Sequence, residues 1–185
     1  LAMAVRERRN ILVVGGTSSG KTTLVNALLA EVADCDERVL ILEDTRELKC
    51  AATDCVALRT KPDVASLADL VRSTLRLRPD RIIVGEVRGP EALDMLKAWN
   101  TGHPGGITTI HANNAFSALR RLEQLTAEAS QQPMHDVIGE AVDLVVSIER
   151  TPTGRRVREV IHVEAWRDGN YQIETYPEEG HLDAA

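Results

Sequence analysis

The sequence predicts an α/β fold, with a mostly parallel sheet flanked by helices and a C-terminal antiparallel strand meander. Through the first 125 residues, short apolar runs alternate with segments of helical periodicity, which is the pattern of a parallel sheet covered by helices. A glycine-rich loop joins the first apolar run to the first helical segment. In the last third of the chain, β-rich runs are separated by turn sequences, which favours antiparallel pairing.

The expected parallel strands are apolar at nearly every position, as strands buried on both faces are. They cover residues 11–14, 39–42, 56–58, 82–84 and 107–110. In the meander, Pro152-Thr-Gly154 and Asp168-Gly-Asn170 are turn sequences. They divide three expected strands at 144–148, 156–165 and 171–175.

The expected helices begin at recognisable signals. They cover residues 21–32, 66–78, 90–99 and a segment from about 115 onward. Ser66 and Asp69 have the spacing of a capping box, in which each residue satisfies the other's backbone amide. Pro90 suits a first helical position, where its missing N–H has no cost.

The 185 residues are enough for one domain with a sizeable core. We expect residues 10–176 to form that domain and residues 177–185 to be a flexible tail. Residues 1–9 have the character of a helix end, and they are expected to lead in from an N-terminal domain that this chain lacks.

Composition narrows the function classes. The net charge of −6 argues against a general nucleic-acid binder, so no direct specific contact with nucleic acid is expected. No apolar run approaches the ~20 residues of a membrane span. The three cysteines, Cys35, Cys50 and Cys55, show no CxxC spacing, which favours reduced thiols in a cytoplasmic protein.

One motif dominates the sequence: residues 15–22 match G-x-x-x-x-G-K-[ST] between an expected strand and an expected helix. The expected nucleotide-binding residues are Gly15, Gly16, Thr17, Ser18, Ser19, Gly20, Lys21, Thr22 and Thr23. Loop amides at a helix N-terminus bind phosphate. Lys21 offsets phosphate charge, and the Thr22 hydroxyl is a hard oxygen ligand for Mg²⁺. The motif therefore predicts a nucleotide polyphosphate as ligand with Mg²⁺ as cofactor, and by itself it does not choose among kinases, GTPases, transporters and motors.

Two acidic segments follow expected strands, whose carboxyl ends line the ligand crevice of a parallel sheet. After 39–42 come Glu43, Asp44 and Glu47, of which a carboxylate can orient and polarise the attacking water. After 82–84 comes Glu86, which suits a role in holding Mg²⁺, directly or through water, or in contacting the nucleophile. The first segment alone is also consistent with a solvated loop.

The segment 101–113 contains two histidines, His103 and His111, eight residues apart. We expect the whole segment to converge on the phosphate loop, with His111 contacting the γ-phosphate. His103 is a secondary candidate. A metal site is not expected, because the histidines lack i, i+4 spacing and no cysteine is near.

We expect the arginines at positions 46, 72, 76, 78, 81 and 88 to cluster around the acidic segments. In a ring, one of them could reach the γ-phosphate of a neighbouring subunit. Arg78 and Arg88 are the best candidates, and ordinary surface charge is the alternative for each.

Together these segments resemble the type II/type IV secretion ATPase superfamily, and within it the ATPases of conjugal transfer. The resemblance is carried by GGTSSGKTTLVNALL, ILEDTREL, LRLRPDRIIVGEVRGPEAL and TGHPGGITTIHANNA, which look like its Walker A, Asp, Walker B and His boxes. It implies a RecA-like P-loop NTPase domain that takes ATP as substrate and assembles into a homo-hexamer. It also implies work beside other secretion or conjugation proteins at the cytoplasmic face of the bacterial inner membrane.

By this resemblance, Lys21 and Thr22 are the Walker A lysine and threonine and Glu86 is the Walker B glutamate. Glu43 becomes the catalytic Asp-box carboxylate, with Glu47 second, and His111 the His-box histidine. One departure is Ser18, where the family usually has glycine. A side chain there could strain the loop, but nucleotide binding is expected to survive.

The sequence leaves alternatives to a conjugative motor. One is a motor of type IV pili or type II secretion, although many extension motors carry a tetracysteine zinc module that this chain lacks. The other is a nucleotide-dependent assembly scaffold with little hydrolysis, which would need neither Glu43 nor Glu86.

Overall fold

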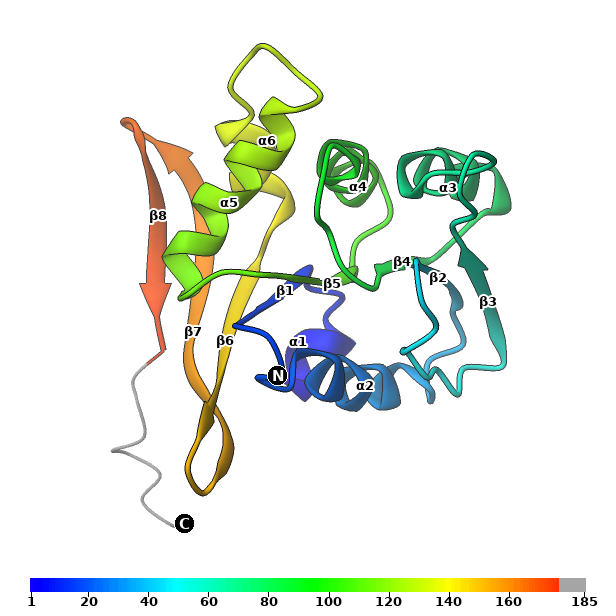
Figure 1. The fold of residues 1–185 in the computed structure, drawn as a ribbon, viewed down its shortest axis with the longest axis horizontal. Helices are drawn as coiled ribbons and strands as arrows, with labels where there is room; N and C mark the ends of the chain where they lie inside the picture. Colours follow the sequence, from blue (N-terminus) through cyan, green and yellow to red (C-terminus); the bar gives the residue numbers. More distant parts are fainter. Residues whose placement is uncertain (177–185) are drawn as a thin grey trace.

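Eight strands form one twisted sheet in the computed structural model, which describes residues 1–176 (Figure 1). Across the sheet the order is β3-β2-β4-β5-β1-β6-β7-β8. The strands are β1 (Ile11–Val14), β2 (Arg38–Glu43), β3 (Asp54–Arg59), β4 (Arg81–Val84), β5 (Ile107–Ile110), β6 (Leu144–Thr151), β7 (Gly154–Arg167) and β8 (Asn170–Thr175). All pairings from β3 to β6 are parallel, whereas β6, β7 and β8 pair antiparallel. This confirms the predicted fold class.

Helices cover both faces of the sheet. They are α1 (Ala2–Arg6), α2 (Lys21–Val32), α3 (Leu67–Thr74), α4 (Glu91–Asn100), α5 (Ala115–Ala127) and α6 (His135–Ala141), with a 3₁₀ turn η1 (Leu75–Leu77). Helices α3, α4, α5 and α6 lie on one side of the sheet, and α1 and α2 lie on the other (Figure 1). Among the described residues, no helix has both the length and the hydropathy that crossing a bilayer requires.

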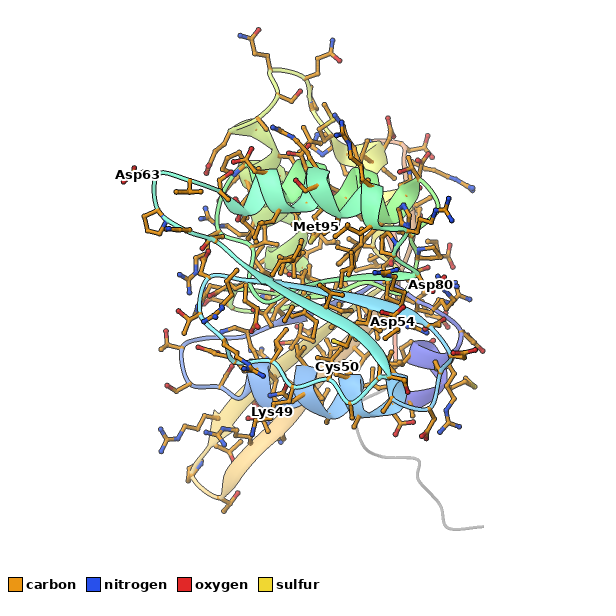
Figure 2. All side chains as sticks on the ribbon, turned by 90° about the vertical axis from the view of Figure 1, so that its right-hand side faces the viewer. Lys49, Cys50, Asp54, Asp63, Asp80 and Met95 are labelled. Carbon is orange, nitrogen blue, oxygen red and sulfur yellow. The ribbon has the colours of Figure 1, made fainter. Side chains whose placement is uncertain are left out.

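The core is divided by the sheet into two apolar layers. Successive side chains of a strand point to opposite faces, so Leu12 and Val14 pack beneath α4 and α5 while Ile11 and Val13 pack against α2. Met95 of α4 is fully buried between its helix and the sheet (Figure 2). Because the chain has few aromatic residues, aliphatic side chains fill most of both layers.

Most local predictions are confirmed. Ser66 and Asp69 form the reciprocal capping box at the start of α3. Pro90 lies one position earlier than expected, as the N-cap of α4. The strands β3, β6 and β7 are longer than expected, and α6 was not predicted. The expected tail, residues 177–185, lies outside the described residues.

A polar network joins the elements at the amino ends of the parallel strands. The Asn10 Oδ1 atom accepts hydrogen bonds from the amides of Gly105 and Gly106, at 2.8 and 2.9 Å. Arg81 is fully buried and paired with Glu37. At Gly106 a Cβ atom would come within 2.0 Å of the Trp99 ring, so only glycine lets the loop before β5 pass this indole. The network fixes the edge of the sheet opposite the phosphate loop.

Candidate nucleotide-binding site

The phosphate loop lies at the carboxyl end of β1 and leads directly into α2. Gly20 is the N-cap of α2 with φ of 104°, a backbone conformation that glycine adopts without steric cost. Lys21 is only 8% exposed, and its Nζ atom donates to the carbonyls of Gly15 and Gly16, both at 3.0 Å. The loop therefore wraps around its own lysine and directs the first amides of α2 toward the crevice.

Ser18 lies in the middle of this loop with φ of 59°. This is the left-handed region, which costs L-residues other than glycine roughly 1–2 kcal/mol. The strain predicted from the serine at this position is therefore present. The loop conformation nevertheless forms around it.

A chain of polar and charged groups continues from Lys21 across the crevice. The Nδ1 atom of His111 lies 3.5 Å from Lys21 Nζ, and its Nε2 atom lies 2.8 Å from Glu86 Oε1. Arg88 Nε donates to the other carboxylate oxygen of Glu86 at 2.7 Å, and this pairing raises the pKa of Arg88. Burial lowers the pKa of Lys21, while the nearby Glu86 carboxylate acts in the opposite direction. Glu86 and His111 thus meet the phosphate loop, as their positions after β4 and β5 predicted.

The two glutamates of the Asp box have different surroundings. Glu43 is 3% exposed, and its Oε1 atom accepts from the amides of Glu47 and Leu48 at 2.9 and 2.8 Å. It therefore organises the loop after β2. Glu47 instead turns its carboxylate toward the phosphate loop, where Thr22 Oγ1 donates to Glu47 Oε2 at 3.1 Å.

These oxygens fit the requirements of Mg²⁺. The Thr22 hydroxyl and the Glu47 carboxylate are hard oxygen ligands placed side by side at the open end of the loop. Asp44 lines the same crevice and accepts from Thr60 at 2.9 Å. The expected ligand Glu86 is held instead by Arg88 and His111, so its part in binding a metal stays a prediction.

The site encloses a cavity of about 440 Å³. Its walls are the phosphate loop, the loop after β2, and the segments that follow β4 and β5. They include Glu43, Glu47, Glu86 and His111. The sequence-predicted residues after β1, β2, β4 and β5 therefore share one crevice.

Two secondary candidates lie elsewhere. His103 precedes β5, and its Nδ1 atom donates to the carbonyl of Pro79 at 2.8 Å. Arg78 lies in the short connection between η1 and β4. Both belong to the amino edge of the sheet, so the expectation that the whole segment 101–113 converges on the phosphate loop is wrong for His103. A residue before a parallel strand lies at the opposite edge from a residue after it.

The arginines do not form one cluster around the acidic segments either. Arg72 of α3 pairs with Asp94 of α4 at 2.8 Å, and Arg81 is buried against Glu37. Only Arg88 of the six lines the cavity. These pairings are structural, which corrects the prediction of a common arginine cluster.

Comparison with known proteins identifies the family. The family described as "Type II/IV secretion system protein" matches residues 1–163. The chain belongs to this family. The conjugal transfer protein TrbB of Rhizobium radiobacter is 65% identical over 94% of this chain, and the match covers 54% of that protein. The VirB11 protein of Bartonella henselae is 35% identical over 88% of the chain and 48% of its own length.

Solved structures agree with this membership in the type II/IV secretion family. The VirB11 ATPase of Brucella suis, solved with sulphate, superposes with a TM-score of 0.80 at 36% identity, over 86% of this chain and 49% of that one. The retraction motor PilT, solved with ADP, has a TM-score of 0.70 at 24% identity, which supports the fold alone. The chain spans about half the length of the relatives it matches. The family resemblance seen in the four boxes is thus confirmed.

Sequence reasoning missed one residue of the crevice, Arg155. It comes from the start of β7, far from the four boxes in sequence, yet it lines the cavity with the phosphate loop. The turn sequence at 152–154 predicted the hairpin that carries Arg155, but no motif indicated that this hairpin would reach the loop.

Proposed function

We propose that this chain binds and hydrolyses ATP as the motor domain of a conjugative type IV secretion system. One observation carries the proposal: a phosphate loop with a buried lysine faces two carboxylates, Glu47 and Glu86, across one crevice. The 65% identity to a conjugal transfer protein favours conjugation over a pilus or type II secretion motor.

Phosphate binding falls to the loop and the first turn of α2. Free amides at a helix N-terminus and the helix dipole attract the polyphosphate. The Lys21 ammonium, held by the Gly15 and Gly16 carbonyls, adds a fixed positive charge in a poorly solvated place, where charges interact more strongly than in water. Bound Mg²⁺ would neutralise phosphate charge, with Thr22 and Glu47 as the residues that hold it.

The remaining groups act at the terminal phosphate. Glu86 is positioned by His111 and Arg88 and serves to orient the attacking water and accept its proton. His111, between Lys21 and Glu86, contacts the γ-phosphate. Glu43 keeps the loop of Glu47 in place through two amides. We therefore assign Glu43 a positioning role instead of the catalytic role expected from the resemblance, and we assign Glu47 to Mg²⁺.

The larger assembly is part of the same proposal. Residues 10–176 would be the ATPase domain of a longer protein, led in by residues 1–9, and six copies would form a ring. The ring would work at the cytoplasmic face of the inner membrane, beside other proteins of the secretion system. Hydrolysis would change the geometry between subunits and so drive pilus assembly or substrate transfer.

The test is ATP turnover by the purified chain with Lys21→Ala, Glu86→Gln and a control, Lys97→Ala, on the exposed side of α4. Lys21→Ala should abolish turnover, and Glu86→Gln should reduce it about 100-fold while leaving ADP binding intact. The control should match wild type. Nucleotide binding without turnover in the wild type, in every assembly state, would favour the scaffold alternative. Unchanged turnover in Lys21→Ala would refute the proposed site.

A further inference from the structure

Arg155 lies over the start of α2, on the opposite wall of the crevice from the acidic groups. If Gly20 carried a Cβ atom, that atom would lie 2.5 Å from Arg155 Cδ and 3.1 Å from its Nε. The missing side chain of Gly20 therefore makes the room that Arg155 occupies. The β6–β7 hairpin thus places a guanidinium directly above the phosphate loop.

The charge of Arg155 has no partner in residues 1–176: no ion pair or side-chain hydrogen bond to it is present there. Its neighbour Arg156 is paired with Glu149 at 2.9 Å on the same hairpin, and Arg88 is paired with Glu86. A positive group near a helix N-terminus and near Lys21 is electrostatically unfavourable. An anion in the crevice would turn this repulsion into attraction.

The order of the strands shows which part of a nucleotide Arg155 would meet. Glu47 follows β2 and Glu86 follows β4, both on one side of β1, whereas Arg155 reaches the loop from β7, on the other side. The metal-binding and water-activating groups mark the terminal phosphate. The opposite wall, with Arg155, therefore faces the α-phosphate.

We propose that Arg155 binds the α-phosphate of the nucleotide and closes the phosphate loop from the hairpin side. This inference rests on the proposed ATP site. Because ADP and ATP both carry an α-phosphate, Arg155 should contribute equally to the binding of both. It should contribute little to the hydrolysis step, which takes place at the other end of the polyphosphate.

The experiment compares Arg155→Ala, Arg155→Lys and the control Arg156→Ala in the full chain. Calorimetric titration would give the dissociation constants of ADP and ATP, and turnover at saturating ATP would give kcat. We expect Arg155→Ala to weaken both nucleotides about 10-fold, the order of one lost hydrogen bond to a charged group. We expect kcat within about twofold of wild type, partial recovery in Arg155→Lys, and wild-type binding in Arg156→Ala.

The outcomes separate this inference from the function it rests on. Wild-type protein that binds no nucleotide would remove the proposed function, and the role of Arg155 with it. If the wild-type protein binds nucleotide and Arg155→Ala binds ADP and ATP as tightly as wild type does, only the inference about Arg155 would be overturned. A loss confined to kcat, or an equal loss in Arg156→Ala, would also overturn it, because either would place the effect in hydrolysis or in the hairpin as a whole.

Discussion

Ser18 shows at the level of a single residue how a departure from the family pattern is accommodated. Its φ of 59° is the conformation for which the family's usual glycine is suited, and the small hydroxymethyl group lines the cavity. Serine loses less backbone entropy on folding than glycine does, which offsets part of the strain. The backbone strain and the smaller loss of entropy therefore nearly cancel, and the loop keeps its shape.

The strain at Ser18 predicts a graded response. Ser18→Gly should leave the free energy of unfolding within about 0.5 kcal/mol of wild type, because the two effects oppose each other. Ser18→Val should lower it by about 1–2 kcal/mol, since a β-branched residue is least tolerant of this region. Urea denaturation would measure both. Equal stability in the valine and glycine variants would contradict the left-handed conformation.

Glu43 and Glu47 divide two tasks that the sequence could not separate. Glu43→Ala should lower the free energy of unfolding by about 1–3 kcal/mol, because the buried amide of Leu48 and the partly buried amide of Glu47 lose their acceptor. Glu47→Gln should keep stability and reduce ATP turnover about 100-fold, because the amide would hold Mg²⁺ less well than the carboxylate. Glu43→Gln, which keeps an acceptor oxygen, is the control. Turnover lost as deeply in Glu43→Gln at unchanged stability would restore Glu43 as the catalytic carboxylate.

Among the elements, β8 is held to α6 by an aromatic cluster. Tyr171 is 7% exposed, and its ring lies edge-on to Trp166 with centroids 4.7 Å apart. Trp166 in turn stacks on His135 of α6 at 4.2 Å. Burial, with the Glu123 carboxylate nearby, raises the pKa of Tyr171 far above its usual value. The phenol therefore stays neutral in the folded chain under alkaline conditions.

A raised pKa in the folded state predicts a loss of stability at high pH. Below about pH 10, Tyr171 is neutral in both states and has no pH effect. Above this, the unfolded chain releases the proton and the folded chain does not, so stability falls by up to about 1.4 kcal/mol per pH unit. Tyr171→Phe should flatten the decline between about pH 10 and 11. Thermal unfolding in that range would test it, and parallel curves for both proteins would contradict the buried phenol.

Elements with a local signal were predictable from the sequence, and those set by tertiary packing were not. The capping box of α3 was predictable from the spacing of Ser66 and Asp69 alone. Helix α6 has only seven residues and contains Gly139, a poor helix former. This glycine is needed because a Cβ atom there would come within 2.7 Å of the Trp166 backbone. That contact joins α6 to β7, so it could not be predicted from the sequence of residues 135–141 alone.

Site residues were predictable where a motif follows a strand, because the carboxyl ends of parallel strands lie at the same edge of the sheet. Glu86 and His111 meet the phosphate loop for this reason. His103 belongs to the same box but precedes its strand, and so lies at the other edge. Arg155 could not be predicted in the same way. The sequence indicates the turn of its hairpin, but it does not indicate that the hairpin extends toward the phosphate loop.

At the scale of the whole molecule, the two arginines favoured for action between subunits lie in different places. Arg88 is bound to Glu86 of its own chain. Arg78 lies at the amino edge of the sheet with φ of 54°, and it has no ion pair among residues 1–176. A residue far from its own phosphate loop is suited to reach the loop of a neighbour. We therefore favour Arg78 for contact with the γ-phosphate of an adjacent subunit.

Mixing two inactive variants tests this contact. Lys21→Ala cannot use its own site, and Arg78→Ala cannot complete its neighbour's, so each alone should turn over little ATP. In a mixed ring, an intact loop in the Arg78→Ala subunit can receive Arg78 from an adjacent Lys21→Ala subunit. Partial turnover should therefore return in the mixture and rise with protein concentration as light scattering reports assembly. Arg76→Ala, two residues earlier in η1, is the control and should be active alone. A mixture as inactive as its components, although it assembles, would show that Arg78 does not act between subunits.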